Sequence, residues 1–159
     1  MQITRAVEYA AMGLIALARR NSGAVVMLDD ISKEEQISPS FLGKIFQSLS
    51  KAGLVRSARG TGGGFSLARS PDLITLLNVF EAVEGPMALQ RCQAPTPSCE
   101  RMDSCALCGV FEQAQDRVKE VFGMTTIADL AQRHRPVGPS AVDPKAILSA
   151  NKTADPNPA

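Results

Sequence analysis

A helical segment followed directly by a glycine-rich turn is the feature that most limits how this chain can fold. The segment ISPSFLGKIFQSLSKAGLV starts with Ser38 at an N-cap position and Pro39 at the first helical position, an arrangement typical of a helix start. The preceding segment DDISKEEQ predicts a short helix, because its acidic residues stand at the end where the helix dipole favours them. A short helix, a tight turn and a second helix together predict a helix-turn-helix.

Two short apolar segments, LVRSA and GFSLA, flank the sequence RGTGGG. Glycine tolerates positive φ angles and close backbone approach, so this stretch predicts a β-hairpin with a tight tip. The first segment of the chain, ITRAVEYAAMGLIALARR, has apolar residues at three- and four-residue steps and predicts another helix. A helix-turn-helix followed by a hairpin is a winged helix. The predicted fold class is therefore mainly α with a small β-wing.

The outer face of the second helix of the pair carries hydrogen-bonding and cationic groups and no acidic residue. Such a face suits DNA, although an ordinary amphipathic helix with a polar outer face has the same pattern. An arginine at the hairpin tip, Arg59, is placed to enter a minor groove. Through residue 70 the chain has 9 Lys and Arg against 5 Asp and Glu, a balance of +4. The residues expected to contact DNA are Ser38, Ser40, Lys44, Gln47, Lys51, Arg59, Gly60 and Thr61.

Beyond the hairpin the chain is expected to be helical again. ITLLNVFEAVEG predicts a helix capped by Thr75 and ended by Gly85. A long helix is expected from about Ser104 to Gly123, and TTIADLAQRH predicts a last short helix. The long helix has a heptad-like seam, and a seam of this kind more often packs into a core than dimerises. Because this helix is long, late in the chain and separate from the winged helix, a dimerisation helix is favoured here. The seam residues are Phe111, Ala114, Val118 and Val121.

Three regions are expected along the chain. Residues 1–72 form the winged helix-turn-helix domain, and residues 73–134 form a linker helix, a cysteine loop and the dimerisation helix. Residues 135–159 are rich in Pro, Ala, Ser and Asn without periodicity, which indicates a disordered tail. No signal peptide and no run of about 18 apolar residues is visible, so we expect a cytoplasmic protein that does not enter the membrane.

All four cysteines of the chain, Cys92, Cys99, Cys105 and Cys108, lie in RCQAPTPSCERMDSCALC. In a reducing compartment, clustered cysteines indicate metal ligands or redox thiols before structural disulfides. Only one closely spaced pair is present, whereas a structural zinc site usually has two, so an irregular loop wrapping an iron–sulfur cluster is favoured. Structural zinc and a Cys105–Cys108 dithiol remain alternatives. Those two residues, three apart at the start of the expected helix, should share a helix face.

The segment ISPSFLGKIFQSLSKAGLVRSARGTGGGFSLARSP, the following ITLLNVFEAVEG and the downstream cysteines resemble the bacterial winged-helix transcription regulators of the IscR and NsrR type. The resemblance runs from Met1 to about His134. It implies a homodimer that binds palindromic double-stranded promoter DNA, as a repressor for instance, and is not an enzyme. It also implies an iron–sulfur cluster, with 2Fe-2S favoured and 4Fe-4S possible, that reports cluster supply, iron, nitric oxide or redox stress.

By this resemblance Cys92, Cys99 and Cys105 match the three cluster cysteines of the family. The fourth ligand is either Cys108, favoured because thiolate is a soft ligand, or Glu8, which stands where NsrR-like members have a carboxylate.

The resemblance also extends to the DNA-reading residues. Arg59 matches the wing arginine, and Ser40 matches a polar residue at the start of the recognition helix. Lys44 stands where IscR-like members have a glutamine that reads bases, so the operator sequence is expected to differ.

Overall fold

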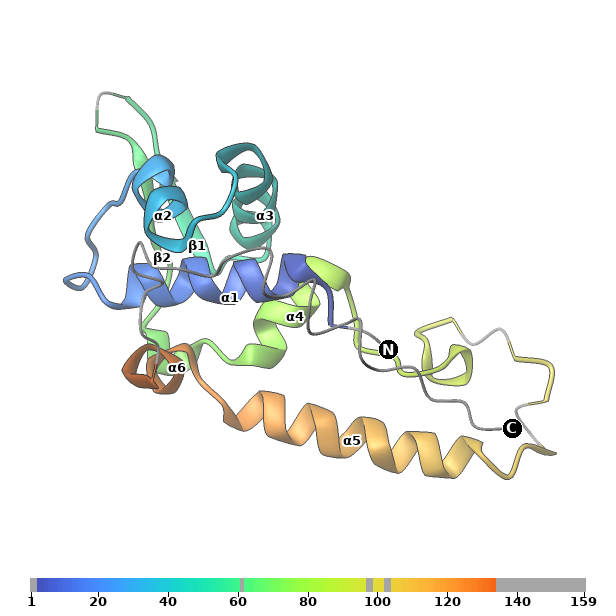
Figure 1. The fold of residues 1–159 in the computed structure, drawn as a ribbon. Coiled ribbons are helices and arrows are strands. Elements are labelled where there is room, and N and C mark those ends of the chain that lie inside the picture. Colours follow the sequence, from blue (N-terminus) through green and yellow to red (C-terminus); the bar gives the residue numbers. More distant parts are fainter. Residues whose placement is uncertain (1–2, 61, 97–98, 102–103, 134–159) are drawn as a thin grey trace, which may run out of the picture.

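The computed structural model describes residues 3–60, 62–96, 99–101 and 104–133. Within them the chain is mainly helical, with one antiparallel two-stranded sheet (Figure 1), and the predicted fold class is confirmed. The elements are α1 (Arg5–Ala18), α2 (Leu28–Glu35), α3 (Pro39–Lys51), β1 (Val55–Ala58), β2 (Gly64–Leu67), η1 (Pro71–Leu73), α4 (Leu76–Glu84), η2 (Arg91–Gln93), α5 (Cys108–Met124) and α6 (Ile127–Arg133).

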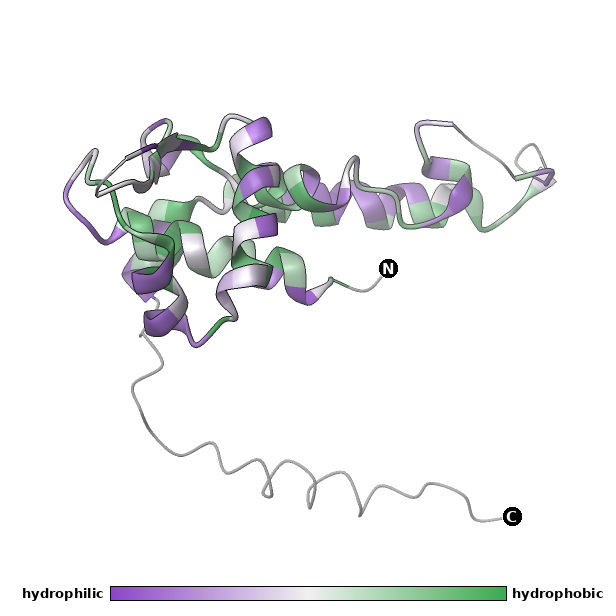
Figure 2. Cartoon of the chain, turned by 90° about the horizontal axis from the view of Figure 1, so that it is seen from above, coloured by the Kyte–Doolittle hydropathy of each residue, from purple (hydrophilic) through white to green (hydrophobic). Residues whose placement is uncertain are grey.

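Helices α1, α2 and α3 enclose an aliphatic core that contains one large aromatic ring, that of Phe46, which is fully buried. Figure 2 shows apolar residues gathered where these helices face one another. Phe41 lies beside the buried Leu42 near the start of α3 but is 39% exposed. Its ring instead meets the ring of Tyr9 on α1 edge to face, with centroids 5.8 Å apart. An aromatic pair at the edge of a core is stable while partly exposed to water. The helical spacing of apolar residues does not show which of them lie at that edge.

The turn of the helix-turn-helix is built from local backbone chemistry. Gln36, just after α2, has a left-handed φ of 54°, and the buried Ser32 hydroxyl donates to the carbonyl of Ile37. Ser38 precedes α3 as predicted, although its hydroxyl pairs with that of Ser40 at 3.0 Å and not with a helix N–H group. Gly53 ends α3 with a φ of 69°, as expected for a glycine just beyond a helix.

The wing is the hairpin of β1 and β2, paired from Val55–Leu67 to Ala58–Gly64. Its base is held by a third segment, since the N–H and C=O groups of Val26 exchange hydrogen bonds of 2.9 and 2.8 Å with Phe65. A Cβ atom at Gly64 would lie 2.2 Å from the carbonyl oxygen of Val26, so only glycine fits there. The ring of Phe65 also packs edge to face on Phe46, with centroids 4.8 Å apart. The wing is therefore fixed to α3.

Helices α4 and α6 complete the same core. Ile74, Val79 and Ile127 are fully buried in it together with residues of α1 and α3. The backbones cross-link as well, because Leu76 N–H donates to Thr125 at 2.8 Å and Ile127 N–H donates to Ile74 at 2.8 Å. The expected start of α4 is confirmed by a reciprocal capping box between Thr75 and Asn78. The core thus extends past residue 72, and the division of the chain into domains remains a prediction.

Between α4 and α6 the chain makes a long excursion. It leaves the compact part at Gly85, forms the cysteine loop, and returns along α5 (Figure 1). Val118 and Phe122 of α5 join a second small core with Val7, Phe80 and Met87. No helix in the described ranges is long and apolar enough to cross a membrane. The tail expected from residue 135 and the lone histidine at position 134 lie outside those ranges.

The expected start of the long helix was wrong. Helix α5 begins at Cys108, not near Ser104. The Ser104 N–H donates to the carbonyl of Arg101, and the Cys108 N–H donates to that of Cys105, so these residues form separate turns. Cys105 therefore precedes the helix and does not share a helix face with Cys108. At the observed start the N-cap position is occupied by Leu107, which makes no side-chain capping hydrogen bond.

Candidate functional site

The outer face of α3 presents the expected polar groups. Ser40, Lys44, Gln47 and Lys51 are exposed, while Ser48 is half-buried. Helix α3 has no acidic residue, and its Pro39 start leaves the exposed Ser38 beside Ser40. Side chains of this kind can donate to phosphates and to base edges in a major groove.

The tip of the wing extends from the same side of the molecule as α3, far from the cysteine loop (Figure 1). Arg59 and Gly60 are exposed, and Gly60 has a φ of 102° in a turn closed by a 2.9 Å bond from Gly63 N–H to its carbonyl. Thr61, the remaining wing residue expected to contact DNA, lies outside the described residues. The structure adds Arg56, which is exposed on β1 opposite Ser66. The sequence did not point to Arg56, because a strand with only one buried residue shows no alternation of apolar and polar side chains.

The four cysteines are free, half-buried thiols. Cys92 lies in η2, Cys99 and Cys105 lie in irregular chain, and Cys108 is the first residue of α5. A hydrogen bond with Cys92 raises the pKa of the Cys108 thiol above its ordinary value. Desolvation, and repulsion from Cys92, Cys105 and Glu112, raise it further. The fold therefore brings Cys92 and Cys105 near enough to Cys108 to raise the pKa of its thiol.

Glu112 lies one helical turn after Cys108 and was not expected from the sequence to be near the cysteines. Its spacing of four residues from Cys108 on a helix could have indicated that the two side chains are neighbours. Glu8, the alternative fourth ligand, is exposed in the first turn of α1 and is absent from the groups that act on the Cys108 thiol. The identity of the fourth ligand stays a prediction.

The described part of the cysteine loop offers sulfur donors for an iron–sulfur cluster. No three or more His, Cys, Asp or Glu side chains among the described residues gather closely enough to hold a metal ion. The thiols are thus spread over a loop and a helix start, and soft sulfur donors of this kind are the ligands of iron–sulfur clusters. In addition, both amide atoms of Gln93, next to Cys92, are closed off from solvent without a hydrogen-bond partner in the described chain. Donor chemistry and an unsatisfied polar group both fit a bound cluster.

The loop is held to α5 before it reaches the cysteines. Gln115 is only 6% exposed, and its Oε1 atom accepts a 3.0 Å hydrogen bond from the N–H of Leu89. Two residues earlier, Met87 is buried against Val7 and Phe80. Sequence reasoning missed Gln115, because a glutamine in an amphipathic helix looks like a solvent-facing residue.

Helix α5 carries an exposed apolar stripe. Its members recur at the a and d spacing of a coiled coil, with exposed Arg117 completing the pattern. Val118, expected in the seam, is half-buried and packs inside the molecule against the small core of Val7, Phe80 and Met87, so its place in a dimer seam stays a prediction. The stripe consists of Leu107, Val110, Ala114, Val121 and Met124, and the four larger side chains are 58–75% exposed.

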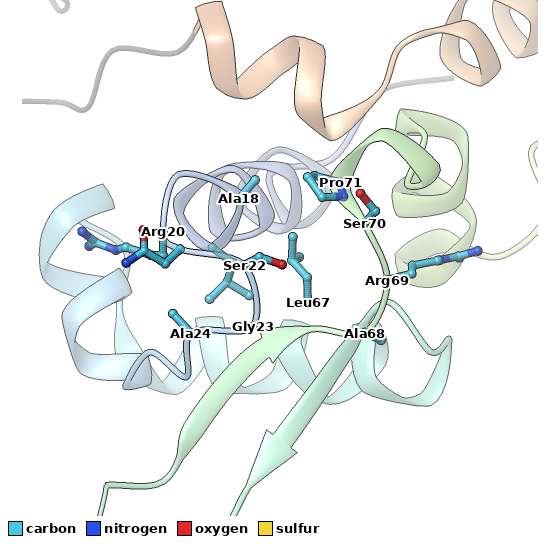
Figure 3. A pocket seen from close by; sticks show the side chains of 12 residues that line it. Ala18, Arg20, Ser22, Gly23, Ala24, Leu67, Ala68, Arg69, Ser70 and Pro71 are labelled. Carbon is cyan, nitrogen blue, oxygen red and sulfur yellow. The ribbon is translucent and has the colours of Figure 1, made fainter.

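A cavity of about 340 Å³ opens between the loop after α1 and the chain after β2 (Figure 3). The hydroxyl groups of Ser22 and Ser70 face it, while the guanidinium groups of Arg20 and Arg69 point away. No carboxylate, thiol or imidazole is among its lining residues, so it holds no acid–base pair. The lining residues are Leu17, Ala18, Arg20, Asn21, Ser22, Gly23, Ala24, Leu67, Ala68, Arg69, Ser70 and Pro71.

Comparison with known proteins agrees with this arrangement. The profile of the Rrf2 family, described as "Iron-dependent Transcriptional regulator", matches residues 3–133. The HTH-type transcriptional regulator IscR of Xenorhabdus nematophila is 31% identical over 132 residues, which is 83% of this chain and 80% of that protein.

Two solved structures have a similar fold. CymR (YrzC), the global cysteine regulator of B. subtilis, superposes with a TM-score of 0.70 at 28% identity, covering 85% of this chain and 99% of that one. IscR of T. potens superposes with a TM-score of 0.67 at 26% identity, covering 84% and 88%.

Proposed function

Because this chain belongs to the Rrf2 family of transcriptional regulators, we propose that it is a homodimer whose promoter binding is controlled by an iron–sulfur cluster in its cysteine loop. One observation carries the proposal. The thiols lie between α4, which packs in the core of the DNA-reading part, and α5, which bears the exposed apolar stripe. A change in the loop therefore acts between the DNA-reading part and α5, the helix proposed to form the dimer. The protein would work in the bacterial cytoplasm.

DNA reading is assigned to α3 and the wing. Ser38 and Ser40 stand at the start of α3, the end that meets base edges in helix-turn-helix proteins, and Lys44, Gln47 and Lys51 follow along its exposed face. Arg59 at the wing tip reaches the adjacent minor groove, with the backbone around Gly60 and Thr61 against phosphates.

The cluster is assigned to Cys92, Cys99 and Cys105, with Cys108 as fourth ligand in preference to Glu8. A 2Fe-2S cluster is favoured, and when bound it supplies a centre that responds to oxidants, nitric oxide and iron supply. The chain's own part is to hold the thiols. Cys92 and Cys108 already interact, while Gln115 fixes the loop to α5 on the side of Leu89. Release of the ligands would free the thiols from the cluster, while the Gln115–Leu89 hydrogen bond still holds the loop to α5.

The dimer is assigned to the exposed stripe of α5. Two copies of one helix with apolar a and d positions pack against each other and remove those side chains from water. Operator half-sites lie about 34–36 Å apart for each helical turn of DNA, so a small change in the relative position of two winged helices alters affinity.

Anaerobic purification followed by a visible spectrum and by iron, sulfide and zinc assays tests the proposal. We expect a coloured protein with iron and acid-labile sulfide in proportion to the chain. Its DNA site is then selected from a random-sequence pool, and binding is compared before and after removal of the cluster. A colourless protein with one zinc per chain would overturn the cluster assignment in favour of a structural metal. Equal DNA affinity of both forms would overturn its regulatory role.

A second candidate function is a thiol switch, favoured by the hydrogen bond between Cys92 and Cys108. In that case two thiols would form a disulfide, giving two protons and two electrons to a peroxide that is reduced to water. A solved structure of the fold neighbour CymR from Staphylococcus aureus is described as its oxidized form. Peroxide treatment of cluster-free protein, followed by peptide mass spectrometry, tests for the bond. A Cys92–Cys108 disulfide that changes DNA affinity in a protein never isolated with iron would support the switch over the cluster.

A further inference from the structure

Two glutamines close to the cysteines have side-chain amides shielded from water, Gln115 as a buried residue and Gln93 as a half-buried one, and only one of the two amides is hydrogen-bonded. The amide of Gln115 on α5 is satisfied, because its oxygen accepts from Leu89 N–H at 3.0 Å. The amide of Gln93 in η2 is not, since neither its Oε1 nor its Nε2 atom has a partner within the described residues, and both atoms are shielded from water. The backbone N–H of Gln93 is already used, donating to Gln90 at 3.0 Å.

An unsatisfied buried amide is unusual in a native protein. Most buried polar atoms have at least one partner, and an exception points to strain, an unseen water or a bound group. An amide has two N–H donors and a carbonyl acceptor, so Gln93 leaves a full set of hydrogen bonds unused. Its place in the chain narrows the options, because it directly follows Cys92, which itself interacts with the thiol of Cys108.

We infer that Gln93 is a positioning residue for the iron–sulfur cluster, its Nε2 amide donating to a sulfur atom of the bound cluster or of a ligand thiolate. The inference rests on the proposed function. Hydrogen bonds to sulfur stabilise negative charge on the cluster and so raise its reduction potential. Groups that orient metal ligands from the next layer commonly change metal affinity 10–100-fold when removed, which is the range expected here.

In the cluster-free protein the effect of Gln93 is the opposite, because there its amide lowers the stability of the fold. There the Gln93 amide is buried without partners, so replacing it by an apolar side chain removes an unfavourable feature. Cluster-free Gln93→Leu should therefore unfold at a higher temperature than cluster-free wild type, by on the order of 3 °C. A residue with a merely structural hydrogen bond would show the reverse.

The experiment compares Gln93→Leu with two matched glutamine variants of the full chain. Gln115→Leu breaks the bond to Leu89 and should lower the unfolding temperature of cluster-free protein. Gln90→Leu changes an exposed side chain in the same loop and should leave both stability and cluster properties unchanged. In the cluster-bound state, Gln93→Leu should show a more negative reduction potential and about tenfold faster loss of iron to a chelator. Gln93→Ala repeats these measurements with a smaller side chain, in case leucine does not fit.

Three outcomes would overturn the inference, and they are distinguishable. An unchanged potential and chelation rate in Gln93→Leu, with a normal wild-type cluster, removes Gln93 from the cluster's surroundings and leaves the proposed function standing. A fall in the unfolding temperature of cluster-free Gln93→Leu, like that of Gln115→Leu, shows that the amide has a partner in the chain or an ordered water. A wild-type protein without iron and sulfide overturns this inference together with the proposed function.

Discussion

Two valines of α5, three residues apart, are expected to do different work. Val121 is 61% exposed and belongs to the apolar stripe, whereas Val118 is half-buried against Phe80 and Met87. In Val121→Ala, two methyl groups are lost at roughly 0.8 kcal/mol each for full burial, and about 61% of that is available to a partner. This is about 1 kcal/mol per chain, and a symmetric dimer counts it twice.

The expected effect of Val121→Ala is therefore about 2 kcal/mol of dimerisation free energy, or about 30-fold in the dimer dissociation constant. Sedimentation velocity over a dilution series measures it. The unfolding free energy of the monomer, measured at concentrations below the dissociation constant, should change by less than about 0.5 kcal/mol, because Val121 is outside the core. The matched Val118→Ala should instead destabilise the monomer by about 1–2 kcal/mol.

If Val121→Ala dimerises like wild type, the exposed stripe of α5 is not the dimer interface. The assignment is also refuted if Val118→Ala strongly weakens the dimer and leaves the stability of the monomer unchanged. In that case the seam expected from the sequence, and not the exposed stripe, faces the partner.

Four further predictions concern the wing, the ligand set and a helix cap. Arg59→Ala should weaken operator binding by about 1–3 kcal/mol and lower the slope of affinity against salt by about one, in titrations at several salt concentrations. Gly64→Ala should displace the base of the wing, because its Cβ would lie 2.2 Å from a backbone oxygen, and thermal unfolding should show a loss of about 1–3 kcal/mol. Cys108→Ala should change the cluster spectrum and Glu8→Ala should not. Hydrogen bonds from Thr126 hold the pKa of Asp129 below its ordinary value of 3.8. The stability that this carboxylate contributes is present above the ordinary pKa and is lost as pH falls through the lowered one, so wild type should lose more stability on acidification than Asp129→Asn.

Controls for these variants are available in the same chain. Arg20→Ala removes a guanidinium already paired with Glu34 and should leave the salt slope unchanged, so an equal effect of both arginine variants would show only lost net charge. Gly123→Ala is the control for Gly64→Ala. It adds a methyl group where nothing lies within 4 Å, and it should stabilise α5 by about 0.5–1 kcal/mol. An unchanged spectrum in Cys108→Ala with a changed one in Glu8→Ala would reverse the ligand preference. If wild type and Asp129→Asn lose equal stability as the pH falls, the Asp129 carboxylate does not contribute to the pH dependence of stability.

The features that the sequence determined by itself are those with local causes. Thr75 caps α4 and Gly53 ends α3 because side-chain and backbone chemistry within one turn decides both. The wing could be placed because glycines at its tip adopt φ angles that other residues avoid, as Gly60 and Gly62 do. These elements, in this order, were enough to predict a winged helix.

Tertiary structure alone decided which face of α5 is buried. A helix that packs on one side and leaves a stripe on another has two apolar faces, and three- and four-residue spacing fits both, so Val118 and Val121 could not be told apart. The burial of Gln115 and of the Gln93 amide was equally hidden, because a glutamine amide is shielded from water only where another segment covers it. The cysteines were found by spacing, but the approach of Cys92 and Cys105 to Cys108 depends on a loop that Gln115 holds through Leu89, 26 residues away in the chain. Contacts between distant segments depend on packing, and local sequence patterns carry no record of it.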